Sequence, residues 1–179
     1  GGFLGAAYDP LQVEADPNNP EFRADAFRLA NGLSVSRMAL RRDLLREFDQ
    51  QRRALDQAAN TVGYSAQQQL AFRLLTSGKL AQAFDLNQED DKHRDKYGRH
   101  MWGQSLLLAR RLIQAGVPIV QVNLGTAGVW DTHQDNFNAL KTRLLPPFDV
   151  AFSALLDDLH ATGVIGETLV VVISASVKS

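Results

Sequence analysis

Two side chains in the stretch VWDTHQDN could act together on a metal ion. Asp131 offers a carboxylate oxygen and His133 an imidazole nitrogen, and Thr132 separates them. In an extended segment, residues two apart point to the same side, so both side chains could reach one ion. A carboxylate and an imidazole suit zinc, manganese or iron better than calcium. We therefore take Asp131 and His133 as candidate metal ligands.

The same residues have a structural alternative. A catalytic zinc usually has three protein ligands and a water, so two ligands do not complete a site. Asp131 could instead cap a helix that begins near Gln134, with His133 as a surface or packing residue. The spacing alone leaves both interpretations open and assigns no catalytic residue.

The other three histidines favour structural roles. His93 lies in the polar connector NQEDDKHRDKYG and is expected to be solvated. His160 falls at a helix C-terminus, where the helix dipole favours a protonated imidazole. His100 opens a helix beside Arg99, and this basic pair is expected to be structural, with contact to an anionic substrate as the alternative.

The candidate ligands need elements that position them. The β-branched run VPIVQVN and the apolar run ETLVVVIS predict two strands buried on both faces, as in a parallel sheet. Between them, apolar residues at helical spacing predict a helix over roughly 136–160, with a kink or two collinear helices at Pro146 and Pro147. The DTH loop would then follow the carboxyl end of a strand, where ligands bind in such sheets.

Helices are predicted before this unit. HMWGQSLLLARRLIQAG has an apolar stripe wide enough for a largely buried helix, and Gly116 suits a left-handed cap. A helix is expected from Ser36, a second over SAQQQLAFRLLTSG, and a short one in KLAQAFDL. The sequence thus divides into a loop-rich excursion (1–36), a helical region (37–116), a strand–helix–strand core unit (117–174) and a divergent tail (175–179) of one partial domain.

The composition excludes several functions. The 179 residues carry a net charge of −1, so no overall positive field favours nucleic acid. The chain has no Cys, which excludes disulfides and thiolate chemistry. No run approaches the roughly 20 apolar residues of a membrane span. The hydrophobic content of 45% is typical of a globular protein.

Several stretches together resemble the domain of unknown function 1501 family. They are GGFLGAAYDPLQV, KYGRHMWGQSLLLARRLIQAGVPIVQVNLG, WDTHQDNFNALKTRLLPPFDVAFSALLDDL and ETLVVV, in this order over residues 1 to about 173. The family looks like a sulfatase-like branch of the alkaline phosphatase superfamily. The resemblance implies an α/β fold with a largely parallel sheet flanked by helices, incomplete in this chain, and a metal site that hydrolyses phosphate or sulfate esters.

On that analogy Asp131 and His133 are metal ligands, the cofactor is a divalent metal such as zinc or manganese, and the substrate is a small anionic ester. The family tends to be exported, which implies a periplasmic or secreted protein. Family members continue after LVVV with Gly-Glu-Phe-Gly-Arg-Thr, whereas this sequence reads ISASVKS. The expectation is therefore a hydrolase fragment that is inactive alone. The alternatives are a non-catalytic binding or scaffold protein that retains the fold, or a helical partner-binding module at 36–116.

Overall fold

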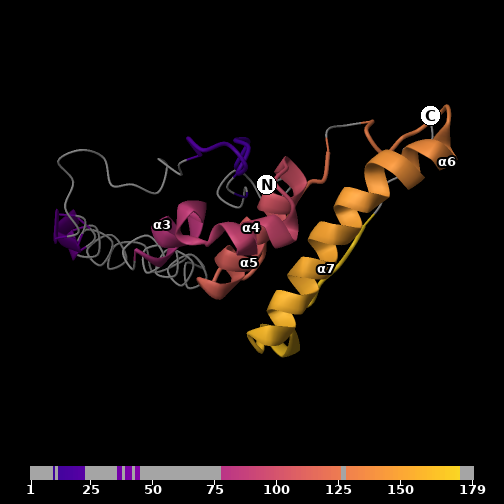
Figure 1. Ribbon diagram of the computed structural model, residues 1–179. Helices are drawn as coiled ribbons and strands as arrows, with labels where there is room; N and C mark the ends of the chain where they lie inside the picture. The colour runs from indigo at the N-terminus through magenta and orange to yellow at the C-terminus, as the bar shows by residue number, and fades with distance from the viewer. Residues whose placement is uncertain are drawn as a thin grey trace, which may run out of the picture.

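The described part of the chain is helical. In the computed structural model, residues 10, 12–22, 36–37, 39–41, 43–44, 78–125 and 128–173 are described. The elements from residue 79 onward are α3 (Lys79–Phe84), the 3₁₀-helix η4 (Leu86–Gln88), α4 (Asp91–Tyr97), α5 (Met101–Gln114), α6 (Asn136–Ala139), the π-helix η5 (Leu140–Leu144), α7 (Leu145–Ala161) and the 3₁₀-helix η6 (Val164–Glu167). Figure 1 shows α7 as a long helix beside the bundle of α3, α4 and α5.

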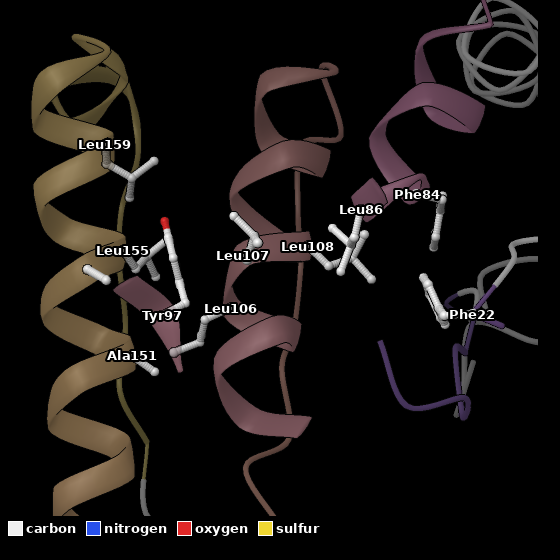
Figure 2. Packing of buried hydrophobic residues seen from close by; sticks show 11 residues of the cluster. Phe22, Phe84, Leu86, Tyr97, Leu106, Leu107, Leu108, Ala151, Leu155 and Leu159 are labelled. Atoms are coloured by element: carbon white, nitrogen blue, oxygen red, sulfur yellow. The ribbon is translucent and has the colours of Figure 1, made fainter. Parts of the chain in front are cut away.

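Helix α5 forms the centre of the core. Figure 2 shows Leu106 and Leu107 directed toward α7 and Leu108 toward Leu86 on the other side. Leu107 and Tyr97 are fully buried. The prediction of a largely buried helix is confirmed, because a helix packed on two sides needs apolar residues over most of its circumference. Gly116 has a φ of 96°, which confirms the predicted left-handed cap.

The prediction of a connector for NQEDDKHRDKYG is wrong over residues 91–97, which form α4. The carboxylate of Asp90 accepts a hydrogen bond from the backbone N–H of His93 at 2.7 Å, so this residue caps the helix. Asp91 in the first turn and Lys96 in the last turn also match the helix dipole. The charged composition had suggested a loop, but these charges stabilise a short helix.

A continuous helical stretch runs from α6 through η5 to α7. The N–H of Leu145 donates to the carbonyl of Leu140, five residues back, at the end of the π segment. Pro146 and Pro147 lie in the first turn of α7, where their missing N–H groups cost least. The prediction of two collinear helices is therefore confirmed, with the wider π turn directly before the prolines.

The predicted parallel sheet is wrong for the described residues. Residues 117–124 and 168–173 form no helix, and neither is paired as a β-strand within the part of the chain that the structure describes. Val122, Leu124 and Val170 instead pack individually against the helical core. Figure 1 shows residues 168–173 running back along α7. The α/β class and the alkaline phosphatase-like core are thus replaced by a helical arrangement, since a strand exists only through hydrogen bonds to a neighbour.

The remaining predictions concern the N-terminal half. The short helix in KLAQAFDL is confirmed as α3, whose Phe84 packs on Phe22 with ring centroids 6.3 Å apart. The described residues between 36 and 44 are helical, whereas the predicted helix in SAQQQLAFRLLTSG lies outside the described residues except for its last one, Gly78. None of the helices formed by described residues is long and apolar enough to cross a membrane.

Candidate functional site

The loop that carries the candidate ligands is held between α5 and α7. Gly125 and Gly128, which both precede the ligands in the chain, have φ values of 116° and 89°, a region open to glycine at little cost. The Trp130 side chain donates its indole N–H to the carbonyl of Leu124. Its ring stacks on Trp102 of α5, with ring centroids 5.5 Å apart, and meets the edge of Phe148 of α7 at 6.3 Å. Aromatic packing thus fixes the loop on both helices.

Asp131 and His133 converge, as the sequence predicts for residues two apart. The Nε2 atom of His133 lies 3.1 Å from the Oδ2 atom of Asp131. Two ligands each bound at ordinary zinc distances, with angles of 90° to 110° at the ion, are about 3.0 to 3.4 Å apart. The spacing of the two atoms therefore fits two coordination positions of one ion.

The capping alternative for Asp131 is not what the structure shows. Asp135 occupies the N-cap position of α6, and no side chain caps that helix. The Asp131 side chain is 56% exposed and that of His133 is 77% exposed. Both groups are accessible to a ligand from solvent.

An open cavity of about 940 Å³ lies beside the pair. Its volume is that of a small-molecule site, and its lining combines apolar and polar groups. It is lined by His100, Met101, Trp102, Gly128, Val129, Asp131, Thr132, His133, Gln134, Arg143, Leu144 and Pro147. The cavity therefore lies between the start of α5, the ligand loop and the junction of η5 with α7.

Arg143 is a candidate that the sequence did not single out. It lies in the π-helix η5 and lines the same cavity as Asp131 and His133. Its side chain makes no ion pair with another residue of the described ranges. A guanidinium in this position can bind an anion through two parallel hydrogen bonds. The only signal in the sequence was an arginine shortly before the proline pair and ten residues after His133.

His100 lines the cavity but is committed to a structural role. Its Nδ1 atom accepts a hydrogen bond from the backbone N–H of Gly103 at 3.2 Å and so caps α5. Burial lowers the pKa of His100 below the ordinary value of 6.5, which favours the neutral imidazole. A ring that accepts at Nδ1 carries its proton on Nε2, so neither nitrogen is open to a metal. The structure thus favours the structural interpretation.

His93 departs from its prediction. It is half-buried in α4, and its Nε2 atom lies 2.7 Å from Oδ2 of Asp158 in α7. Tyr97 and Lys96 donate hydrogen bonds to the same carboxylate at 2.7 and 3.0 Å. Burial alone raises the pKa of Asp158, but hydrogen bonds from Tyr97 and Lys96 outweigh burial and hold the pKa below 3.8. The Asp158 carboxylate joins α4 to α7. The sequence did not predict this role, because the partners of Asp158 are about 60 residues away in the chain.

A second, half-buried carboxylate extends this ionic contact. Glu89 accepts hydrogen bonds from Arg110 at 2.6 Å and from Arg111 of α5. Burial raises the pKa of Glu89, but the two guanidinium groups outweigh burial and hold the pKa below 4.5.

His160 is exposed in the last turn of α7, where it was predicted.

The described ranges hold no group of three or more His, Asp or Glu side chains that could bind a metal ion together. Asp131 and His133 therefore fit a divalent ion by donor type and by spacing, but they supply only two ligands. Any further ligand has to come from residues outside those ranges or from a bound molecule.

The described fold and site define a helical protein with an exposed carboxylate–imidazole pair at an open cavity. The model of the family described as "Protein of unknown function (DUF1501)" matches residues 1–175, so the chain belongs to that family. The expected family membership is confirmed. No curated protein and no solved structure matches the chain.

Proposed function

We propose that this chain is part of a metal-dependent hydrolase of phosphate or sulfate esters. The observation that carries the proposal is the approach of Asp131 Oδ2 and His133 Nε2 to 3.1 Å at a cavity that Arg143 also lines. The resemblance of the family to the sulfatase-like branch of the alkaline phosphatase superfamily supports the same chemistry. It also supports an extracytoplasmic location.

In this proposal Asp131 and His133 hold a divalent ion, with zinc or manganese matching the donor types. Such an ion supplies charge stabilisation for the attacking and leaving oxygens of the ester. Arg143 binds the equatorial oxygens of the phosphate or sulfate group and orients it toward the pair. Overall, water breaks the bond between the ester oxygen and phosphorus or sulfur, and the alcohol and the free anion leave.

The first test is stoichiometric metal binding. The 179-residue chain is dialysed against zinc, and the bound metal is measured by elemental analysis and by competition with a chromophoric chelator. We expect Asp131→Ala and His133→Ala each to lower the zinc affinity at least about tenfold, since even groups that only orient a ligand contribute that much. Asp149→Ala and His160→Ala change the same residue types at exposed positions of α7 and serve as matched controls.

The second readout asks whether this chain alone carries out the hydrolysis. The zinc- and manganese-loaded chains are assayed with 4-nitrophenyl phosphate and 4-nitrophenyl sulfate. Turnover that is lost in Asp131→Ala supports a hydrolase. Zinc bound through this pair without turnover keeps the metal site and agrees both with a fragment that is inactive alone and with the non-catalytic binding alternative. Zinc binding that persists unchanged in both variants contradicts the proposal.

A further inference from the structure

The cavity beside the metal pair is lined by two chemically different kinds of side chain. Asp131, His133 and Arg143 bring charged groups to the lining, while Met101, Trp102 and Pro147 bring apolar surface. Trp102 is half-buried, so part of its indole ring is accessible from the cavity. A molecule that contacts both kinds of side chain needs an anionic group and an apolar group.

The apolar lining contains a preorganised aromatic surface. Trp102 stacks on Trp130 with an angle of 22° between the rings. Phe148 meets the edge of Trp130 and stacks on Phe152 at 5.2 Å. The rings come from α5, the ligand loop and α7, so Trp102 packs on a ring that is itself held against α7. A flat ligand ring can stack on such a surface without first ordering it.

We infer that the ester taken by this cavity is an aryl ester, and that Trp102 is the specificity-determining residue for its ring. The inference rests on the proposed function, because Arg143 and a divalent ion on the Asp131–His133 pair are taken to hold the anionic group. A sugar ring presents hydroxyl groups instead of a flat aromatic face, so it gains less from stacking on Trp102.

The competing explanation is that the aromatic stack only fastens the ligand loop to the helices. The two explanations differ in a measurable way. A fastening role affects the binding of every anion equally, because it acts through the position of the loop. A ring-binding role affects only those esters that carry an aromatic group.

The experiment compares four probes on the zinc-loaded 179-residue chain: inorganic phosphate, methyl phosphate, phenyl phosphate and glucose 1-phosphate. Binding is measured by titration calorimetry and by tryptophan fluorescence. Both tryptophans of the chain belong to this stack, so the fluorescence reports on the proposed site directly. The variants are Trp102→Leu, the conservative Trp102→Phe, and Trp130→Phe as a control that keeps Trp102.

We expect phenyl phosphate to bind about tenfold tighter than methyl phosphate, the upper range of one aromatic stacking contact. This preference for phenyl phosphate disappears in Trp102→Leu and is partly restored in Trp102→Phe. It persists in Trp130→Phe. Inorganic phosphate binds the native chain and the three variants with the same affinity. Near-ultraviolet circular dichroism checks that each variant is folded, and Trp102→Phe decides the matter if Trp102→Leu does not fold.

Equal affinity for phenyl and methyl phosphate overturns the inference, as does a preference that survives in both Trp102 variants. Glucose 1-phosphate binding as tightly as phenyl phosphate overturns it in favour of a general ring site. Phenyl phosphate binding that depends on Trp102, without binding of inorganic phosphate, keeps the ring subsite and removes the anion site of the proposed function.

Discussion

Two pairs of the same residue types lie in opposite environments in this molecule. Asp158 and His93 approach to 2.7 Å in the core, where the Asp158 side chain is only 8% exposed. Asp131 and His133 approach to 3.1 Å in a loop, where the Asp131 side chain is 56% exposed. The first pair joins two helices, and the second joins residues of one loop.

The comparison shows how the environment distinguishes an Asp–His pair that stabilises the fold from one that is free to bind a ligand. The Asp158 carboxylate already accepts hydrogen bonds from Tyr97 and Lys96, so an incoming ion would have to displace them. Within the described residues, Asp131 and His133 have only each other as ion-pair partners. A buried charge is retained because its partners compensate for the lost water, whereas an exposed pair at a cavity remains open to a ligand.

The largest expected effect is on stability. Asp158→Ala leaves Tyr97, Lys96 and His93 without their shared acceptor, and breaking a buried charge pair costs about 3 kcal/mol of the free energy of unfolding. Asp131→Ala removes an exposed carboxylate and changes the free energy of unfolding by no more than about 0.5 kcal/mol. Urea unfolding followed by circular dichroism measures both variants.

Asp157→Ala is the matched control, because its carboxylate is exposed in the same turn of α7 and lies 3.5 Å from Lys96. Similar losses for Asp157→Ala and Asp158→Ala would remove the special role of the buried carboxylate. A loss in Asp131→Ala as large as that in Asp158→Ala would erase the difference between the two regions.

A smaller effect is expected in acid. The folded pKa values of Asp158 and Glu89 lie below their ordinary values of 3.8 and 4.5. Their contribution to stability is therefore fully present above the ordinary values and is lost as the pH falls through the lower folded values. The urea midpoint is expected to stay level above about pH 5 and to drop below about pH 4.

Asp158→Asn removes one of the two titrating groups. Its urea midpoint is lower at neutral pH but falls less steeply in acid than that of the native chain. Parallel acid curves for the two proteins would show that Asp158 does not contribute to the acid sensitivity.

Local pattern predicted those parts of the fold that depend on neighbours in sequence. The apolar spacing from Trp102 to Ile113 predicted a buried α5, and Pro146 with Pro147 predicted the junction before α7. The runs VPIVQVN and ETLVVVIS were taken as strands of a sheet, but pairing is a property of two segments, and β-branched composition in one segment cannot supply it. Helix α4 was missed because Tyr97 is its only buried apolar residue.

In the candidate site, too, the sequence predicted what depends on neighbouring residues and did not predict what depends on packing between distant segments. The convergence of Asp131 and His133 follows from their spacing of two, and the structure confirms it. Arg143 and Trp102 come to the cavity only through the packing of α5 and η5 around the loop. The role of His93 depends on Asp158, which no local pattern connects to it. Whether Asp131 and His133 bind a metal remains a prediction.

The most direct measurement of the difference between the two pairs is a zinc titration followed by imidazole ¹⁵N resonances. The chain has four histidines, so each can be assigned by substitution. We expect the Nε2 resonance of His133 to shift with added zinc, and the resonances of His93, His100 and His160 to stay in place. A shift of His93 with an unchanged His133 would contradict the account, because it would make the buried pair the available one.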